Sequence, residues 1–504
     1  MGNVRVHPLL KEIAALFISR GKRLYLVGGA VRDLLRGRPA SDWDLATDAR
    51  PEEVMAIFRN TRPPSPVIPT GIKHGTVTVH YRGKGGGPEK RGTGNTDGTA
   101  TGAEAAYTGL EITTFRTESG YSDGRRPENV VFASSIEEDL SRRDFTMNAA
   151  AVRLPGGEII DPFDGRADIQ RRIIRCVGNP AERFAEDGLR PLRAVRFAAQ
   201  LGFTVDRATL DAARGALDVT AKVSAERVRD ELDKILASGT EEAGTGKAGT
   251  EAARPSTAFR LMEETGLLRL ILPELAACRG VEQKGYHRFD VLDHCLLACD
   301  YASKEGWPRE VILAALLHDA GKPATAAGPY GDGSGKREWT FYRHEEESSR
   351  LAREILTRLR YPGAVAGTVC RLIEEHMFHY DEGWSDAAVR RFIIRTGEEN
   401  LENLYRLRRA DAFAAEGAER GADFLLPLAE RVDRALAERK ALSLKDLAVS
   451  GKDLMEAGIQ PGKTMGIILK ELLETVIDDP ESNSREKLLA IAANLARRYS
   501  SSDS

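Results

Sequence analysis

Long hydrophobic runs are missing from this sequence of 504 residues. No apolar stretch approaches the roughly 18–20 residues that a helix needs to cross a bilayer. The first residues, Met1 to Lys11, are polar and lack the apolar centre of a secretory signal peptide. With 30% charged and 41% hydrophobic residues, the composition is typical of a globular protein. We therefore expect a cytoplasmic protein that does not bind membranes.

Cysteine is also scarce, with only five residues in the chain. Their number is odd, they are scattered, and no two of them form a CxxC pair. We interpret them as reduced core residues rather than as disulfide, metal or redox groups. They are Cys176, Cys278, Cys295, Cys299 and Cys370.

An excess of positive charge is missing as well, because 73 basic and 76 acidic residues give a net charge of −3. The overall charge therefore gives no sign of a nucleic-acid-binding protein. Arginines are nevertheless concentrated in one stretch, which could hold an RNA or nucleotide phosphate. A solvated arginine face is the alternative interpretation. The stretch contains Arg171, Arg172, Arg175, Arg183, Arg190, Arg193 and Arg196, and it follows Arg142 and Arg143.

Two segments of low complexity, residues 82–109 and 238–256, are rich in Gly, Thr and Ala. Such composition predicts flexible chain. The first segment lies between two alternating apolar runs, Thr76–Tyr81 and Leu110–Phe115, so we expect an expanded hairpin loop there. Residues 20–160 mix strand and helix patterns, and helical periodicity dominates from about residue 165 onward.

A glycine pair and two carboxylates form the first chemical pattern. In LVGGAVRDLLRG, Leu26–Gly37, an apolar strand is followed by Gly-Gly and a helix, a turn that lets backbone approach a phosphate. Asp42 and Asp44 follow in SDWDLAT, and residues two apart on a strand point to the same face. Paired carboxylates predict a site for Mg²⁺, which supports nucleotidyl transfer.

These motifs resemble the head domain of the DNA polymerase beta nucleotidyltransferase superfamily. They are more closely similar to class II tRNA nucleotidyltransferases, the CCA-adding enzymes, and to bacterial poly(A) polymerases. Residues 111–149, which contain RRDFT, are similar to that family's flexible loop and following motif. Residues 161–203 are similar to its neck, and the resemblance covers nearly the whole chain apart from the two inserts.

The resemblance implies roles for individual residues of the head and neck. Asp42 and Asp44 would hold Mg²⁺, and Glu111 would be a third carboxylate of the catalytic site. The implied nucleotide-binding residues are Gly28, Gly29, Arg32, Arg143, Asp187, Arg190, Arg193 and Arg196.

Selection of the base is implied to depend on the motif Glu186, Asp187 and Arg190. Asp187 accepts and Arg190 donates hydrogen bonds, which suits the Watson–Crick edges of C and A. Arg190, Arg193 and Arg196 are three residues apart and lie near one helical face. The sequence departs from the family at Gly188 and Pro191, which predict a later helix start.

A second pattern combines histidine and aspartate over about 120 helical residues. Side chains from several helices can converge at the centre of a bundle, and imidazole with carboxylate suits Mn²⁺, Ni²⁺ or Fe²⁺. The adjacent His318–Asp319 pair resembles the HD phosphohydrolase superfamily, which implies a hydrolytic metal centre. The implied ligands are His294, His318, Asp319, His344, His376 and Asp411.

The expected fold class is α+β: a polymerase-beta-like head with a mixed sheet, then an all-α neck, an HD-type helical body and a helical tail. The expected boundaries are 1–160 for the head, 161–280 for the neck, 281–430 for the HD domain and 431–504 for a tail that resembles the tRNA-holding domain. The expected function is addition of CCA, or its terminal A, to tRNA from CTP and ATP. A poly(A) polymerase, or primarily an HD phosphohydrolase acting on RNA ends or cyclic nucleotides, remains an alternative.

Overall fold

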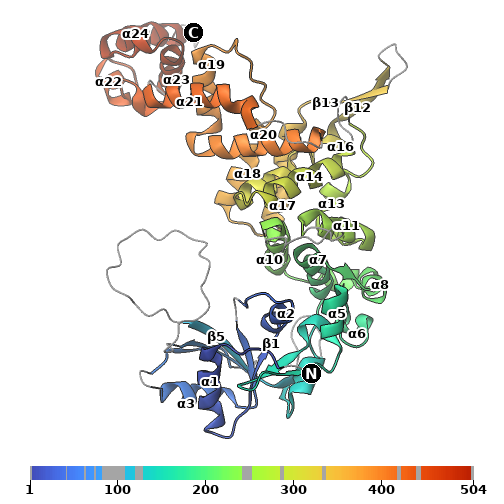
Figure 1. Ribbon diagram of the computed structural model, residues 1–504. Coiled ribbons are helices and arrows are strands. Elements are labelled where there is room, and N and C mark those ends of the chain that lie inside the picture. The colour runs from blue at the N-terminus through green and yellow to red at the C-terminus, as the bar shows by residue number, and fades with distance from the viewer. Residues whose placement is uncertain are drawn as a thin grey trace. The chain divides into compact units, whose positions relative to one another are not determined.

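The chain forms two compact units, residues 1–271 and 272–504, in a computed structural model (Figure 1). A mixed sheet lies in the first unit, and helices dominate the second, which confirms the α+β class. Asp42 and most of both low-complexity segments lie outside the described residues. The structure describes residues 3–40, 43–61, 64–72, 75–81, 108–119, 129–240, 253–283, 289–331, 337–416, 422–438 and 444–500.

A seven-stranded sheet in the order β3-β4-β5-β2-β1-β8-β9 organises the head. Strands β2 and β5 are parallel and the other neighbours are antiparallel. The antiparallel pairing of β4 with β5 confirms the expected hairpin. The strands are β1 (Leu24–Val27), β2 (Asp44–Thr47), β3 (Val67–Gly71), β4 (Thr76–Tyr81), β5 (Thr108–Thr114), β8 (Ala151–Arg153) and β9 (Glu158–Ile160).

Strand β1 is buried on both faces, and its successive residues point to opposite sides of the sheet. Leu24 and Leu26 of β1 join the core with helices α1 (Pro8–Ile18) and α3 (Pro51–Arg59). Tyr25 and Val27 of the same strand join the opposite core, which α4 (Ile136–Ser141) covers. Strand β1 therefore ends, just before Gly28, between two packed layers.

Helices follow the head and pack around Phe145, Phe184 and Phe197. A short parallel pair, β10 (Ile173–Ile174) with β11 (Thr204–Val205), is the strand structure described in this region. The longer helices are α5 (Gly165–Arg171), α6 (Pro180–Glu186), α7 (Arg190–Leu201), α8 (Arg207–Gly215), α10 (Ala225–Leu236) and α11 (Pro255–Thr265).

The second unit is built around α15 (Arg309–Leu317), which is buried at every position from Val311 to Leu317. A helix that is apolar on all sides must lie at the centre of its domain. Helices α14, α18 and α20 contact it, so the residues that follow α15 enter a buried space. The surrounding helices are α14 (Val291–Lys304), α17 (His344–Arg358), α18 (Gly363–Glu375), α19 (Asp386–Thr396), α20 (Leu401–Glu416) and α21 (Leu426–Glu438).

The helical pattern expected from about residue 165 onward is interrupted in this region, where the prediction of helix was wrong. After the short helix α16 (Lys322–Thr325), strands β12 (Ala326–Gly331) and β13 (Arg337–Phe341) form an antiparallel hairpin. The physical reason is local, since Gly328 and Pro329 disfavour helix and Trp339 to Phe341 are strand formers.

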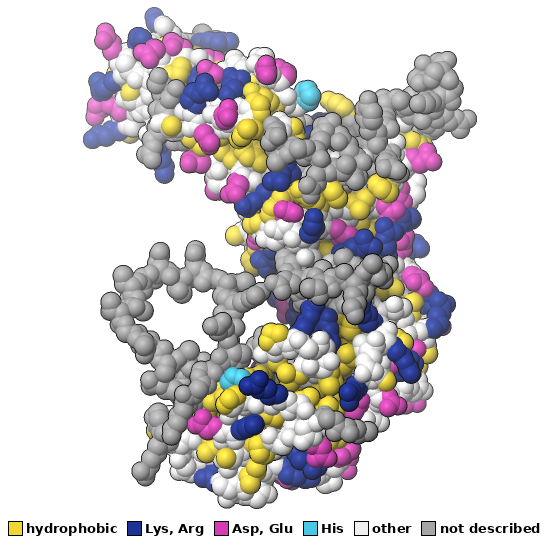
Figure 2. All heavy atoms as spheres, viewed as in Figure 1, with side chains coloured by type: hydrophobic (Ala, Val, Ile, Leu, Met, Phe, Trp, Pro, Cys, Tyr) yellow, Lys and Arg dark blue, Asp and Glu magenta, His cyan; other side chains and the backbone are white. Residues whose placement is uncertain are grey.

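The tail has its own core between α22 (Gly451–Glu456), α23 (Lys463–Asp478) and α24 (Arg485–Ser500). Basic and acidic side chains are interspersed on its visible face (Figure 2). No described helix in either unit is long and apolar enough to cross a membrane. All five cysteines are free and buried, which confirms that they are core residues.

Candidate functional site

The turn after β1 places three of the predicted head residues together. Gly28 has φ +71° and ψ −139°, and helix α2 (Gly29–Leu35) begins immediately after it. A Cβ atom at Gly28 would lie 3.2 Å from Asp44 Oδ2 and 3.2 Å from Arg143 Nη1. The backbone turn, one predicted metal ligand and one predicted nucleotide-binding arginine therefore share one small space.

Strand register brings the second described carboxylate beside the first. Asp44 and Glu111 are direct partners on the parallel strands β2 and β5, and both are exposed. Partners on neighbouring strands project to the same face, about 5 Å apart. Two adjacent carboxylates that are not buried among apolar groups suit a hard divalent cation such as Mg²⁺. This donor set fits the predicted metal, although Asp42 lies outside the described residues.

Arg143 is held by a residue that the sequence patterns did not single out. Asp139 in α4 is buried and forms salt bridges with Arg142 (2.8 Å) and with Arg143 (3.4 Å). Burial alone would raise the pKa of the Asp139 carboxyl, but the two guanidinium charges hold it below its usual range. Asp139 thereby stays charged and keeps Arg143 near the Gly28 turn.

The guanidinium of Arg32 lies between the head and helix α7. It donates to the Asp33 carboxylate (3.0 Å) and to Asn148 Oδ1 (3.2 Å). It also lies over the ring of Phe197 in α7, at 5.4 Å from the ring centroid. Gly29 is adjacent, since a Cβ there would be 3.5 Å from Arg32 Nη2. Gly29 and Arg32 thus belong to the same region as Gly28.

Asp144 links the RRDFT segment to α7. Its carboxylate accepts from Arg193 Nε (2.8 Å) and from Asn148 Nδ2 (3.2 Å). Burial on its own would raise the pKa of Asp144, but the charge and hydrogen bonds of Arg193 lower it to about 2. Asn148 in turn bonds Arg32, so a continuous polar chain runs from α7 to α2.

The predicted base-reading residues lie where α6 ends and α7 begins. Arg190 is buried and donates to Glu186 Oε2 (2.6 Å), while Asp187 Oδ2 accepts from Arg227 Nη2 (2.8 Å). Packing explains why position 188 is a glycine, because a Cβ atom there would lie 2.4 Å from the carbonyl oxygen of Val219. Helix α7 begins at Arg190 with proline in its first turn.

Arg196 differs from the other arginines of this group in its surroundings. Its side chain is buried and pairs with Glu231 of α10 and with Gln200. Burial lowers the pKa of Arg196, and the Glu231 charge opposes this effect. Its guanidinium also lies over the Phe197 ring at 3.8 Å from the centroid. These contacts join α7 to α10.

Histidine and aspartate side chains converge at the end of α15 in the second unit. His294 Nε2 is 3.0 Å from His318 Nε2 and 3.2 Å from Asp411 Oδ1. His344 Nε2 is 3.1 Å from Asp319 Oδ1, and His376 Nε2 is 3.9 Å from the same oxygen. Ligand atoms of His294, His318 and Asp411, and separately of His318, Asp319 and His376, lie within 4.8 Å of one another.

Three of these histidines are oriented by backbone carbonyls. The Nδ1 atoms of His318, His344 and His376 lie 2.9, 2.9 and 2.7 Å from the carbonyl oxygens three residues earlier. Because a carbonyl only accepts, each Nδ1 carries a proton, so in the neutral ring Nε2 is the atom that is left to bind a metal. This is the tautomer that a metal-ligating imidazole needs, so the donor set fits a transition-metal ion.

A buried lysine compensates the aspartate of this cluster. Lys322 Nζ is 2.6 Å from Asp319 Oδ2 and 2.6 Å from Gln283 Oε1. Burial would raise the pKa of Asp319, but Lys322 and His318 hold it well below its usual range. Burial lowers the pKa of His376 to about 3. The sequence analysis did not assign a role to Lys322, although it lies only three residues after Asp319, because its burial was not visible in the sequence.

Three family models match separate parts of the chain. Residues 24–175 match the poly A polymerase head domain. Residues 202–245 match a model described as an RNA and SrmB-binding site of polymerase A, and residues 334–492 match tRNA nucleotidyltransferase domain 2.

Curated relatives and a solved structure match almost the full length. A CCA-adding enzyme of Geobacillus stearothermophilus is 35% identical over 480 residues, which is 94% of this chain and 93% of that protein. One from Lactobacillus delbrueckii subsp. bulgaricus is 33% identical over 500 residues, with 98% and 100% covered. The Bacillus stearothermophilus CCA-adding enzyme in complex with CTP has a TM-score of 0.65 at 29% identity and covers 99% of this chain and 100% of that chain. Because such relatives align along nearly the whole chain, it belongs to the CCA-adding enzyme family of tRNA nucleotidyltransferases.

Proposed function

We propose that the first unit adds CCA, or its terminal A, to the 3′ end of tRNA from CTP and ATP. The arrangement of Gly28, Asp44, Glu111 and Arg143 is the single observation that supports this most strongly. The 3′ hydroxyl of the RNA attacks the α-phosphorus, the bond to the β-phosphate oxygen breaks, and pyrophosphate leaves. Backbone at Gly28 and Gly29 and the guanidinium of Arg32 bind the triphosphate, and Arg143 contacts the incoming nucleotide.

Mg²⁺ bound by Asp44, Asp42 and Glu111 would lower the pKa of the attacking hydroxyl and neutralise the leaving pyrophosphate. The carboxylates of this chain hold that charge in place, because Asp44 and Glu111 are fixed by strand register rather than by a loop. Asp42 enters this proposal from the sequence spacing, two residues before Asp44.

Base choice would depend on Asp187 and Arg190, which accept and donate hydrogen bonds to the base edge. Arg193 and Arg196 support that site from the same helix: Arg193 through Asp144, and Arg196 through Glu231. The family's flexible-loop sequence, residues 121–140, argues against an enzyme that adds only CC. The tail, which we propose contacts the tRNA body, argues against a poly(A) polymerase.

A second proposal concerns residues 281–430, which we expect to form a domain between a neck at 161–280 and a tail at 431–504. We propose that the His–Asp cluster binds a transition metal, Mn²⁺, Ni²⁺ or Fe²⁺, and hydrolyses a phosphoester. Water attacks phosphorus and the ester P–O bond breaks, releasing an alcohol. The convergence of correctly oriented imidazoles on Asp319 and Asp411 supports it.

Truncated tRNAs test the first proposal. RNA that lacks CCA, CA or A is incubated with CTP, ATP or both. The proposal expects C to be added to the first RNA and A to the last. An enzyme that never adds C is an A-adding or poly(A) enzyme.

Metal-dependent hydrolysis tests the second proposal. Purified protein is assayed with adenosine 2′,3′-cyclic phosphate and with phosphomonoesters in the presence of Mn²⁺ or Ni²⁺. We expect hydrolysis that His318→Ala removes. Absence of hydrolysis with every metal contradicts the hydrolytic centre.

A further inference from the structure

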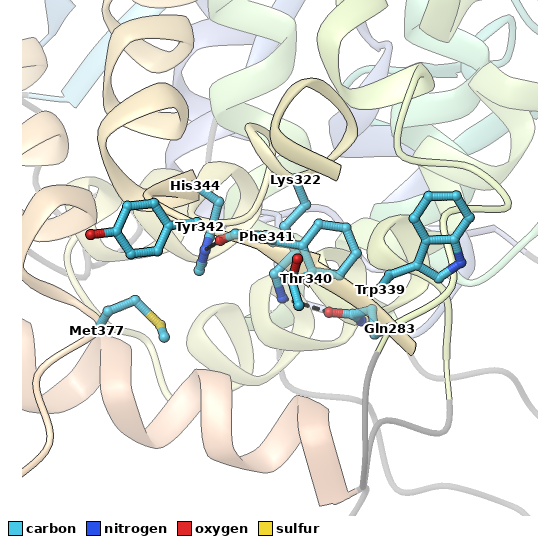
Figure 3. Close-up of a pocket in the computed structure, with 8 residues that line it drawn as sticks. All are labelled: Gln283, Lys322, Trp339, Thr340, Phe341, Tyr342, His344 and Met377. Atoms are coloured by element: carbon cyan, nitrogen blue, oxygen red, sulfur yellow. Dashed lines mark hydrogen bonds between the residues drawn. The ribbon is translucent and has the colours of Figure 1, made fainter. Parts of the chain in front are cut away.

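A cavity of about 350 Å³ adjoins the His–Asp cluster, and His344 and Lys322 belong to both. Its other walls come from the end of the β12–β13 hairpin and from the residues after α18. Figure 3 shows Tyr342 and Met377 at one end, Trp339 and Gln283 at the other, and Phe341 between them. The lining residues are Gln283, Lys322, Trp339, Thr340, Phe341, Tyr342, His344 and Met377.

Aromatic side chains dominate this cavity, and one of them is unusually exposed. Tyr342 is 84% exposed and Met377 is 53% exposed, while Trp339 and Phe341 are partly buried. A large apolar side chain gains no stability from such exposure, so these residues are available to a ligand. Flat aromatic rings favour a flat ligand that stacks on them.

The hydrogen bonds of the cavity connect it to the proposed hydrolytic centre. His344 Nδ1 donates to the carbonyl oxygen of Phe341 (2.9 Å), and Lys322 Nζ lies 5.7 Å from the centroid of the Phe341 ring. The same Lys322 ammonium contacts Asp319. A ligand in the cavity that carries a phosphate would therefore have that phosphate beside the metal-binding cluster.

We propose that this cavity binds the base of a nucleotide whose phosphate lies at the His–Asp cluster. The proposal rests on the hydrolytic function proposed above and names its substrate class. Its volume is at the small end of the roughly 300–1,000 Å³ typical of ligand pockets, which suits a mononucleotide. None of the eight lining residues, all described, is an acid that would repel a phosphate.

Recognition in this cavity is by stacking rather than by reading of base edges. The side-chain amide of the lining, Gln283, is held in place by Lys322 (2.6 Å) and by the carbonyl of Phe289 (3.3 Å), which leaves one N–H and one lone pair. Most of the surface offered to a base is the rings of Trp339, Phe341 and Tyr342. Stacking on aromatic rings is tolerant of base identity. The cavity therefore binds purine and pyrimidine nucleotides with similar affinity.

The fluorescence of Trp339, which lines the cavity, reports binding there and not at the nucleotide site of the head. The chain has four tryptophans, and Trp43→Phe, Trp307→Phe and Trp384→Phe leave Trp339 alone. In this full-length protein with Mn²⁺, adenosine and uridine 5′-monophosphate should quench Trp339 fluorescence saturably. Ribose 5-phosphate, which has no base, should bind at least about fivefold more weakly.

Substitutions at Tyr342 supply the matched comparison. Tyr342→Ala should weaken both nucleotides about fivefold or more and leave ribose 5-phosphate unchanged, whereas Tyr342→Phe keeps the ring and the affinity. Leu426→Ala, an exposed apolar residue of α21, is the control. Equal affinities for ribose 5-phosphate and the nucleotides, or no quenching, overturn the proposal.

The second measurement is hydrolysis by protein that keeps all four tryptophans and carries only the substitution at Tyr342. The KM for a nucleotide substrate should rise in Tyr342→Ala and stay in Tyr342→Phe. Hydrolysis that Tyr342→Ala leaves unchanged overturns the base pocket but not the hydrolytic centre. Quenching without hydrolysis under any metal supports the pocket and overturns the centre.

Discussion

The left-handed glycine at the end of β1 determines how close backbone comes to the proposed reacting groups. A Cβ atom at Gly28 would lie 3.2 Å from side-chain atoms of Asp44 and of Arg143. The backbone angles of Gly28 suit glycine alone. A side chain at this position would occupy the space that we assign to a phosphate. Gly37 also has positive φ (+75°), but nothing lies within 4 Å of the point that a Cβ atom would occupy there. A side chain at Gly37 would therefore not displace a ligand.

Gly28→Ala should therefore abolish most nucleotide addition, whereas Gly37→Ala should retain it. Gly37→Ala should lower the free energy of unfolding by about 1–2 kcal/mol, because alanine is strained at positive φ. Gly28→Ala should cost more, because φ +71° with ψ −139° lies outside the left-handed helical region. Initial rates of ATP addition to tRNA that lacks the terminal A, together with urea unfolding, measure the two effects. Equal loss of activity in both variants would show that backbone strain alone is responsible.

Asp144 should give unit 1 a pH-dependent stability. Its pKa is about 2 in the folded protein, below the ordinary value of 3.8. The carboxylate therefore stabilises the folded state fully above about pH 4, by about 2 kcal/mol, and this contribution is lost as the pH falls towards 2. The difference in unfolding free energy between wild type and Asp144→Asn should shrink over that range.

Asp218→Asn, which removes an exposed carboxylate of α9 (Leu217–Thr220), is the control for loss of one negative charge. Urea unfolding at several pH values between 2 and 6 measures both variants. A gap between wild type and Asp144→Asn that stays constant from pH 4 to 2 contradicts the role of the Asp144–Arg193 pair.

Residues with self-contained patterns were found from the sequence, and their partners were not. Gly28, Asp44 and the HD pair belong to short motifs with fixed spacing. Asp139 and Lys322 matter because they face Arg143 and Asp319, which are positioned by the fold. The two pairs are four and three residues apart, so their spacing is visible in the sequence, but the burial that makes each pair important is not.

At the scale of elements, strand register and helix ends position the chemistry. The hairpin of β4 with β5 could be predicted, because both runs alternate and a loop-forming segment joins them. The parallel pairing of β2 with β5, which places Glu111 beside Asp44, could not, since it joins strands 60 residues or more apart in sequence. The β12–β13 hairpin was missed because Gly328 and Pro329 interrupt the alternating pattern of β12.

The start of α7 should be sensitive to a single methyl group. A Cβ at Gly188 would lie 2.4 Å from the Val219 carbonyl oxygen and 2.9 Å from the Thr220 nitrogen. Gly188→Ala should therefore destabilise unit 1 by about 1–3 kcal/mol and displace Asp187 and Arg190. We expect the ratio of kcat/KM for CTP and ATP to change, in addition to a lower melting temperature.

Gly215→Ala, at the end of α8, is the matched control, because nothing lies within 4 Å of its Cβ position. It should leave both the melting temperature and the CTP-to-ATP ratio close to wild type. If Gly188→Ala lowers stability while the nucleotide ratio stays the same, the α7 start does not position the base-reading residues.

At the scale of the whole molecule, the chain carries two proposed centres in two compact units. Family membership was predictable because long motifs occur in the family's order along nearly the whole sequence. The two centres use different donor chemistry: carboxylates on two neighbouring interior strands in unit 1, and imidazoles with aspartates among helices in unit 2. We therefore expect that a substitution in one centre removes its own reaction and leaves the reaction of the other centre intact.

Nucleotide addition by two variants assayed side by side is the decisive measurement for the transfer site. Asp44→Asn removes one carboxylate of the sheet site, and His318→Ala with Asp319→Ala removes the helical cluster. We predict that Asp44→Asn lowers CCA addition by at least about a thousandfold while hydrolysis remains. The double variant should retain addition. Undiminished addition of CCA by Asp44→Asn would contradict the proposed transfer site.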